Sequence, residues 1–369
     1  MAEKEYRLKF GEGIVSGIIA LVLSGLSFLG VLAFYFPEYL TTPDLRKMYS
    51  VEFARELMFY GLVIAGGLAT FNVVRGNKKR LGLIAWFLIA LTLLLGANSI
   101  EITDIKTGTP YIGMDWFILD LLGSSIIFIA IEKFWQFRDQ PILRLGWQTD
   151  TYHFLLNHLL VGFVLLVSNH FVSNVFGWAI GLGTEDLILA LPFIVQVFLI
   201  VLFADLVQYW FHRAYHEIPF LWRFHAVHHS AKKMDWLAGS RQHILEVILT
   251  RCMVLVPIFV LGFPKAVIDL YIIIVGFQAV FNHANARFNF GWLKYIIVTP
   301  QFHHWHHSSD KAAIDKNYAA HFSLLDYIFG TAVKGQKEWP EEYGVVGDYV
   351  PDGLIKQQLF PFTNKIDSE

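Results

Sequence analysis

Residues 187–229 read LILALPFIVQVFLIVLFADLVQYWFHRAYHEIPFLWRFHAVHH. Residues 187–211 of this stretch are almost entirely apolar, and residues 212–229 contain five histidines. A helix needs about 20 mostly apolar residues to cross the hydrocarbon core of a bilayer. The stretch therefore predicts a membrane-spanning helix that ends in a group of histidines at the membrane surface.

The chain as a whole is also rich in apolar residues. Only 16% of the 369 residues are charged and 55% are hydrophobic, whereas soluble domains carry about a quarter charged residues. Seven further apolar segments can span a membrane: 14–36, 57–74, 81–97, 116–131, 154–176, 244–261 and 266–281. We expect an all-α integral membrane protein, a multi-span helical bundle with a cytoplasmic histidine-rich helical cap. The net charge of −2 gives no reason to expect nucleic acid as a partner.

The distribution of lysine and arginine predicts the orientation, because cytoplasmic loops are enriched in these residues. Loops on the N-terminal side carry Lys4, Arg7, Lys9, Arg75, Lys78, Lys79, Arg80, Lys133, Arg138 and Arg144. Loops on the other side carry Arg46, Lys47, Arg55 and Lys106. This bias places the N-terminus in the cytoplasm. If successive segments cross the membrane in alternate directions, and residues 262–265 form a tight helical hairpin, every histidine cluster lies at the cytoplasmic face.

Three short histidine clusters follow: HRAYH at residues 212–216, HAVHH at 225–229 and HHWHH at 303–307. Side chains four residues apart share one face of a helix, whereas adjacent residues diverge by about 100°. Adjacent histidines therefore cannot easily bind one ion, but each can serve one of two neighbouring ions. The repeated HxxHH spacing favours a two-metal site, and metal-buffering histidine-rich loops lack such spacing.

One acidic residue lies inside the apolar run. Asp205 precedes His212 by seven residues, which is two helical turns, so both lie on one face. Ionisable residues within a membrane are costly and usually functional. We expect Asp205 to accept the ring N–H of a metal-binding histidine and so to hold that ring in place. An ion pair with Arg213 or another base is the alternative.

Histidines outside the three clusters are less clearly assigned by sequence. His283 ends the last apolar segment and is a candidate ligand, or else a capping or surface residue. His243 can be a ligand, a supporting group or an interfacial residue, and His153 is left open in the same way. His170 should lie toward the far side of the membrane and is excluded. We do not expect His304 or His321 to bind metal.

Together these motifs resemble the fatty acid hydroxylase / sterol desaturase superfamily of membrane di-iron oxygenases, most closely its alkylglycerol monooxygenase-like and bacterial sterol desaturase-like members. The resemblance covers roughly residues 147–331 and includes DLVQYWFH at 205–212, HAVHHS at 225–230, TPQFHHWHH at 299–307, DKNY at 315–318 and LDYIFGT at 325–331. It implies nine metal ligands: His212, His216, His225, His228, His229, His283, His303, His306 and His307. His304 departs from the pattern, because relatives often carry another residue there, and it can be a bystander or an alternative ligand.

The resemblance also implies two iron ions and O2-dependent hydroxylation or desaturation of a lipid, such as a fatty acyl chain, a sterol or an ether lipid. The single cysteine, Cys252, excludes an internal disulfide and a cysteine-ligated cluster. Electrons must then come from a separate ferredoxin, cytochrome, reductase or reduced pterin. A non-catalytic metal-binding or transport protein, and a metal-dependent lipid or aldehyde lyase, are the alternatives.

Three regions are expected. Residues 1–146 form an N-terminal transmembrane region of about four spans, residues 147–331 form the catalytic domain, and residues 332–369 form a cytoplasmic tail.

Overall fold

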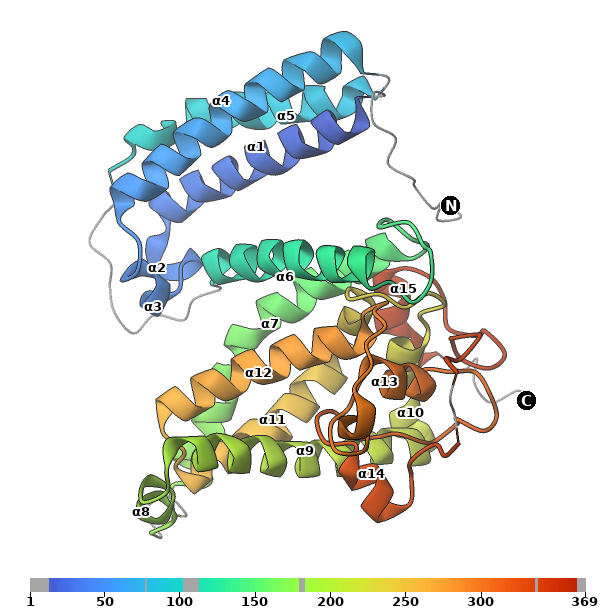
Figure 1. Ribbon diagram of the computed structural model, residues 1–369. Coiled ribbons are helices and arrows are strands. Elements are labelled where there is room, and N and C mark those ends of the chain that lie inside the picture. Colours follow the sequence, from blue (N-terminus) through green and yellow to red (C-terminus); the bar gives the residue numbers. More distant parts are fainter. Residues whose placement is uncertain (1–12, 77, 102–112, 179–182, 336–337, 364–369) are drawn as a thin grey trace. The chain divides into compact units, whose positions relative to one another are not determined.

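The computed structural model describes residues 13–76, 78–101, 113–178, 183–335 and 338–363 (Figure 1). Within these ranges nearly all regular structure is helical, and extended backbone pairs only at two isolated bridges, Gln136 with Ala286 and Ser308 with Tyr343. The expected all-α class is therefore confirmed. The chain divides into two compact units, Tyr6–Leu122 and Gly123–Glu369, with the boundary inside helix α6 (Met114–Phe134).

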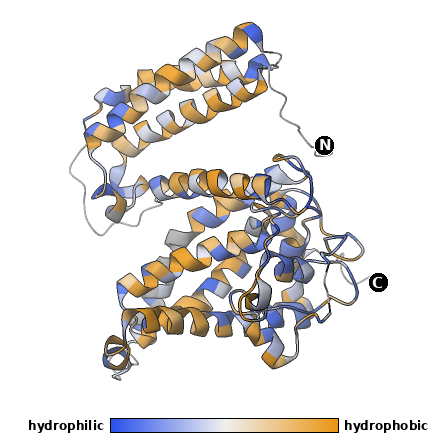
Figure 2. Ribbon diagram, viewed as in Figure 1, coloured by the Kyte–Doolittle hydropathy of each residue, from blue (hydrophilic) through white to orange (hydrophobic). Residues whose placement is uncertain are grey.

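Seven helices of the described chain are long and apolar enough to cross a membrane, and apolar residues dominate them in Figure 2. These candidate spans are Ile14–Tyr35, Val51–Arg75, Lys79–Ser99, Met114–Phe134, Phe193–Glu217, Ile244–Leu261 and Lys265–His283. They correspond to seven of the eight expected segments. The eighth, 154–176, overlaps α7 (Trp147–Asn174), a helix in which several side chains lie outside the described residues. The protein is thus a multi-pass membrane protein.

The first unit is built around three long helices. Its elements are α1 (Ile14–Tyr35), α2 (Pro37–Leu40), α3 (Pro43–Arg46), α4 (Val51–Arg75), α5 (Lys79–Leu94) and η1 (Ala97–Ser99). Helices α1, α4 and α5 pack against one another through small buried residues, Ala20, Ala69 and Ala85. At Gly82 a Cβ atom would lie 2.7 Å from the carbonyl oxygen of Ala69. Such small residues let membrane helices approach closely.

The second unit contains the remaining helices. They are α7, α8 (Thr184–Leu189), α9 (Phe193–Glu217), α10 (Pro219–His229), η2 (Ala238–Ser240), α11 (Ile244–Leu261), α12 (Lys265–His283), η3 (Gly291–Tyr295), α13 (Pro300–His306), α14 (Leu324–Phe329), α15 (Leu354–Leu359) and η4 (Phe360–Phe362). Fully buried Ile200, Ile258 and Val267 join α9, α11 and α12 in one apolar core. This core fixes the ends of α9 and α12, where histidines lie.

The segment expected as one span over 187–211 is broken in the structure. A short helix, α8, ends at Leu189, and α9 begins at Phe193 directly after Pro192. Proline has no N–H and disfavours helical backbone in the preceding residue, which favours a break in the helix at this position. Helix α9 instead extends beyond the apolar run to Glu217 and carries the first histidine cluster.

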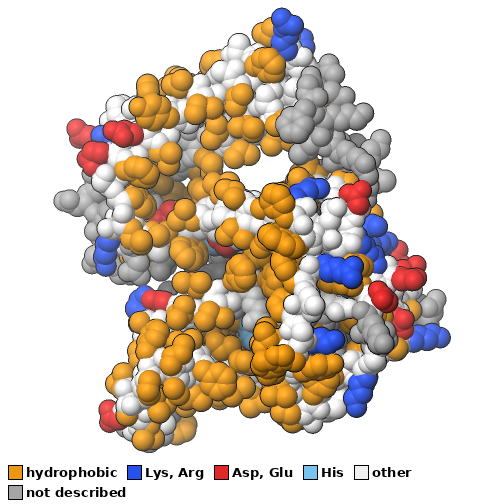
Figure 3. Space-filling model, in the orientation of Figure 1, with side chains coloured by type: hydrophobic (Ala, Val, Ile, Leu, Met, Phe, Trp, Pro, Cys, Tyr) orange, Lys and Arg blue, Asp and Glu red, His pale blue; other side chains and the backbone are white. Residues whose placement is uncertain are grey.

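The expected helical hairpin is present. Helix α11 ends at Leu261, Gly262 caps it with a left-handed φ of 77°, and α12 begins at Lys265. Glycine adopts this conformation without a steric penalty. In the second unit, apolar side chains cover the long helices, and charged side chains gather around the C-terminal segments (Figure 3).

Candidate metal centre

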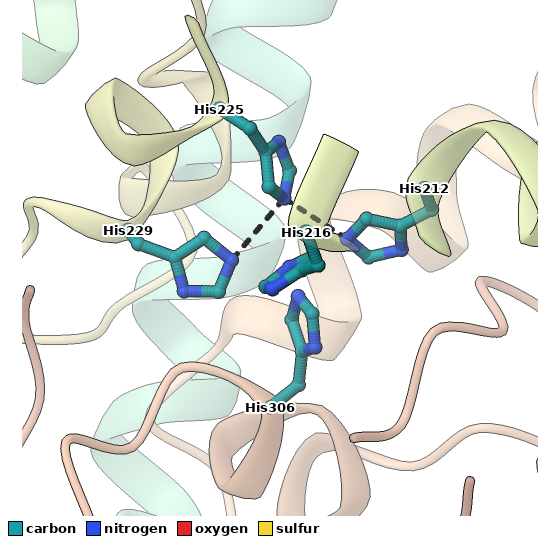
Figure 4. A group of neighbouring side chains, drawn as sticks. All are labelled: His212, His216, His225, His229 and His306. Carbon is teal, nitrogen blue, oxygen red and sulfur yellow. Dashed lines mark hydrogen bonds between the residues drawn. The ribbon is translucent and has the colours of Figure 1, made fainter. Parts of the chain in front are cut away.

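Five histidines from three helices form the first of two groups. His212 and His216 lie one turn apart near the end of α9, and α10 turns back after Ile218 with Pro219 as its first residue. Proline is favoured at this position because its ring already has helical φ and no N–H needs a partner there. The members are His212, His216, His225, His229 and His306, with one ring nitrogen of each within 4.8 Å of the others (Figure 4).

Four buried histidines form the second group. They are His228 from α10, His283 at the end of α12, and His303 and His307 from α13 and its C-terminal cap. The groups adjoin, since the rings of His229 and His307 stack with centroids 4.4 Å apart. Two of the three adjacent histidine pairs are divided between the groups: in the first of these, His228 lies in the second group and His229 in the first. His306 and His307 are divided in the same way.

Outward hydrogen bonds fix the orientation of most rings. Four rings donate Nδ1–H to backbone carbonyl oxygens: His212 to Tyr318 at 2.6 Å, His228 to Arg241 at 2.9 Å, His283 to Ala279 at 2.7 Å and His306 to Lys316 at 2.8 Å. His225 and His216 bond through Nδ1 to carboxylates of Glu246 (2.7 Å) and Asp315 (3.2 Å). A carbonyl oxygen only accepts, so Nδ1 carries the proton and Nε2 keeps its lone pair.

The inward nitrogens fit a bound cation. His228 and His283 both donate Nδ1–H to carbonyls, yet their unprotonated Nε2 atoms lie 3.3 Å apart. Two lone pairs repel at this distance unless a cation lies between them. Nitrogens bound to one metal ion at about 2.1 Å lie roughly 3.0–3.4 Å apart. The Nε2 atoms of His216 and His306 are buried without a hydrogen-bond partner, as a site for a cation requires.

Burial also keeps these rings neutral. The pKa values of six members of the two groups are lowered well below 6.5, first by burial and then by neighbouring histidines: His225, His228, His229, His303, His306 and His307. Removal from water disfavours the charged imidazolium. Neutral imidazole is the form that binds metal. The two groups are therefore in the protonation state that a metal centre needs.

A buried ionic network supports His228. The Arg241 carbonyl accepts its Nδ1–H, and the Arg241 guanidinium bonds Asp150 at 2.6 Å. Arg144 joins Asp150 at 2.6 Å and Asp235 at 2.5 Å. Buried charges are stable only when paired in this way. This network, like Glu246 beside His225, was not found from sequence, although an acid in an apolar run was the signal that drew attention to Asp205.

The role expected for Asp205 is corrected by the structure. Its carboxylate accepts the backbone N–H groups of Ala320 (2.9 Å), His321 (3.1 Å) and Phe322 (2.6 Å) rather than a histidine ring N–H. These bonds hold the segment whose Tyr318 carbonyl accepts from His212. Asp205 therefore acts on His212 through the backbone, because a chain segment lies between the carboxylate and the histidine ring.

The remaining histidines lie outside both groups. His243 bonds through Nε2 to the Gln358 carbonyl, and its Nδ1 accepts from Leu245. His153 contacts Gln242 and Gln357 through its two ring nitrogens. Both nitrogens of His304 are also engaged, and His321 pairs with Gln278. None of these four rings belongs to either group.

The fold and the site define a multi-pass helical membrane protein with a buried centre of nine histidines. Comparison with known proteins shows that residues 197–331, which include all nine, match the fatty acid hydroxylase family model. The chain is therefore similar to the fatty acid hydroxylase family over this region, which confirms the resemblance seen in its motifs.

Several characterised proteins are similar to this chain. Ornithine lipid hydroxylase OlsE of Rhizobium tropici is 30% identical over 174 residues, 47% of this chain and 52% of that protein. Human alkylglycerol monooxygenase is 34% identical over 128 residues, covering 35% of this chain and 28% of the relative. Rice very-long-chain aldehyde decarbonylase GL1-7 is 28% identical over 161 residues, 37% and 25% of the two chains. The chain thus spans about half or less of these relatives, and no solved structure matches.

Proposed function

We propose that this protein is a membrane-bound di-iron oxygenase that hydroxylates or desaturates a lipid, using O2 and electrons from an external donor. The observation that carries the proposal is the convergence of nine histidines into two adjoining groups. In this proposal all nine are metal ligands, and each group holds one ion. The match of residues 197–331 to the fatty acid hydroxylase family model supports it.

Each part of the site has a defined task in this proposal. Iron held by the Nε2 atoms would supply the O2-dependent redox chemistry that acid–base side chains cannot perform. In six of the nine rings the Nδ1–H group keeps its proton on a fixed carbonyl or carboxylate acceptor, which orients the ring and raises its basicity. Burial of the second group excludes bulk water from the reacting position.

The surroundings favour a lipid substrate. Large apolar side chains on α9, including Phe193, Ile194 and Phe198, are 51%, 72% and 52% exposed and suit contact with acyl chains. The same helix carries His212 and His216. In this proposal a substrate within the bilayer approaches the centre along α9. The relatives' names refer to an ornithine lipid and to alkylglycerol, which are an aminolipid and an ether lipid, two of the classes among which the sequence could not choose.

We further propose that the N-terminus and the metal centre are cytoplasmic. The excess of lysine and arginine in the loops that precede the centre supports this orientation. In the same proposal, residues 147–331 act as the catalytic domain, and residues 332–369 form a cytoplasmic tail. A ferredoxin, cytochrome, reductase or reduced pterin would deliver the electrons, since the chain has a single cysteine and cannot build its own iron–sulfur cluster.

A second candidate reaction has specific support. Aldehyde decarbonylases are among the relatives, so the same centre can be considered for cleavage of a long-chain aldehyde. The two reactions differ in product: hydroxylation adds one oxygen atom, desaturation removes two hydrogen atoms, and decarbonylation shortens the carbon chain.

Product analysis tests the proposal. Iron-loaded protein in lipid nanodiscs is supplied with O2, a chemical reductant and extracted membrane lipids, and the products are measured by mass spectrometry. We expect a lipid that gains one oxygen or loses two hydrogens, and we expect no such product from His228→Ala. His170→Ala is the matched control, because this exposed histidine bonds only to Asn174 in the described chain and belongs to neither group. Chain-shortened products would support the decarbonylase reaction instead.

A further inference from the structure

His283 occupies a central place in the second histidine group. Its Nε2 lies 3.0 Å from that of His303, 3.2 Å from that of His307 and 3.3 Å from that of His228. It is also the last residue of α12 and the only member that this helix contributes. A small shift of His283 therefore changes all three distances at once, so its position determines the geometry of the group.

The backbone at Gly239 lies directly against the His283 ring. A Cβ atom at this glycine would lie 2.7 Å from Nδ1 and 3.0 Å from Cγ of His283, closer than real Cβ contacts. The ring has little freedom to move, because its Nδ1–H already bonds the Ala279 carbonyl at 2.7 Å. The other edge of the ring faces the three Nε2 atoms. Only glycine at position 239 allows the ring and the η2 turn to keep this contact.

His304 holds the backbone of the same residue. The carbonyls of the last helical turn have no partner within their own helix, and the buried His283 carbonyl accepts from His304 Nε2 at 3.1 Å. Because the carbonyl only accepts, His304 is protonated at Nε2. Its Nδ1 then accepts the Tyr343 hydroxyl at 2.7 Å. Neither nitrogen of His304 is free for metal, although the residue lies between ligand candidates in sequence.

We propose that Gly239 and His304 are positioning residues for His283: the glycine sets the plane of the ring, and the histidine anchors the end of α12. Tyr343 in turn orients His304. This inference rests on the proposed metal-binding role of the second group. It assigns His304, which sequence left as either a bystander or an alternative ligand, to the support of a ligand.

Metal content distinguishes the contribution of Gly239. Wild-type protein is expected to hold two ions per chain, and Gly239→Ala is expected to lose most of the ion in the second group, giving about half the wild-type content. Gly276→Ala is the control, because it lies on α12 seven residues before His283 and a Cβ there meets nothing within 4 Å. The magnetic coupling between the two ions, measured by electron paramagnetic resonance, should be lost in Gly239→Ala and kept in Gly276→Ala. Full metal content and coupling in Gly239→Ala would overturn this part of the inference.

Substitutions at His304 distinguish a positioning role from ligation. His304→Gln retains an N–H donor for the His283 carbonyl, whereas His304→Phe keeps a ring and removes both nitrogens. We expect His304→Phe to weaken binding of the second ion about 10–100-fold in a chelator competition, and His304→Gln to restore most of the affinity. Equal loss in both variants would make His304 a ligand and overturn the inference. These variants decide the question even if Gly239→Ala fails to fold.

The metal content of the wild-type protein distinguishes failure of the proposed function from failure of the positioning role alone. If wild-type protein binds no transition metal, the proposed function fails. If it binds two ions and all the variants do so as tightly, the proposed function stands and the positioning role fails.

Discussion

Nδ1 of His225 lies 2.7 Å from a carboxylate oxygen of Glu246, and both side chains are buried. Glu246 is in the first turn of α11, whereas His225 is in α10, so this contact joins two helices at the centre. A carboxylate that accepts the outer N–H of a ligand histidine fixes the ring and makes Nε2 a stronger donor. The pair connects the membrane-spanning core to the first histidine group.

Removal of this acceptor should weaken metal binding. We expect Glu246→Gln to lower the affinity of the first group about 10-fold and Glu246→Leu up to about 100-fold, since the amide retains a weaker acceptor and leucine retains none. Chelator competition with iron-loaded protein measures the change. Glu217→Gln is the control, because Glu217 is 46% exposed and its carboxylate pairs with the Arg213 guanidinium rather than with a histidine ring nitrogen. Equal affinity in all four proteins would show that Glu246 has no part in metal binding.

Substitution of two adjacent histidines should affect different ions. His228 belongs to the second group and His229 to the first. We expect His228→Ala and His229→Ala each to abolish product formation and to retain mainly one ion, but in different surroundings. Mössbauer spectra of the two variants should therefore differ from each other. Identical spectra would mean that the two rings serve the same ion.

Asp205 should contribute to folding more than to metal affinity. An asparagine has only one oxygen for the three backbone N–H groups that Asp205 now binds. We expect Asp205→Asn to destabilise the protein by about 1–3 kcal/mol and to increase hydrogen exchange at residues 320–322. Asp269→Asn is the control: Asp269 forms an exposed pair with Lys265, and its substitution should change neither the stability nor the hydrogen exchange at residues 320–322. Unchanged exchange at 320–322 in Asp205→Asn would contradict this role.

Metal-free protein should lose stability in mild acid. Burial lowers the pKa values of His225, His228, His229, His303, His306 and His307 in the folded chain. The unfolded chain therefore binds protons first as the pH falls below about 6.5, at a cost of up to about 1.4 kcal/mol per pH unit for each ring. Acids whose pKa values are raised by burial, such as Asp326 at about 6, act in the opposite direction, but the histidines with lowered pKa values outnumber them.

Thermal unfolding of metal-free protein between pH 7.5 and pH 5 measures this effect. We expect the unfolding temperature to fall with pH, and bound metal to shift the fall to lower pH because protons must displace it. A constant unfolding temperature over this range would contradict neutral buried histidines.

Much of the architecture could be predicted from sequence because it depends on local patterns. Apolar length marks the membrane helices, and Gly262 between two apolar runs marks the hairpin. The HxxHH spacing separates adjacent rings such as His306 and His307 by about 100° on a helix. The break at Pro192 was missed, although the proline was visible, because the apolar run continues on both sides of it.

The support of the centre could not be predicted, because it depends on tertiary contacts. Asp205 had the right depth and face to reach His212, but it meets the backbone of residues 320–322, more than a hundred positions later. Gly239 has no local signal, since its importance depends on the His283 ring against it. His304 resembles its ligand-like neighbours in sequence and differs only in its partners, Tyr343 and the His283 carbonyl.

The central claim is that histidines from distant parts of the chain hold two metal ions side by side. X-ray absorption spectroscopy at the iron edge, with elemental analysis of the same sample, tests it most directly. We predict two iron ions per chain, each in a shell dominated by imidazole nitrogen. Less than one transition-metal ion per chain in active protein, or a shell without imidazole, would contradict the account.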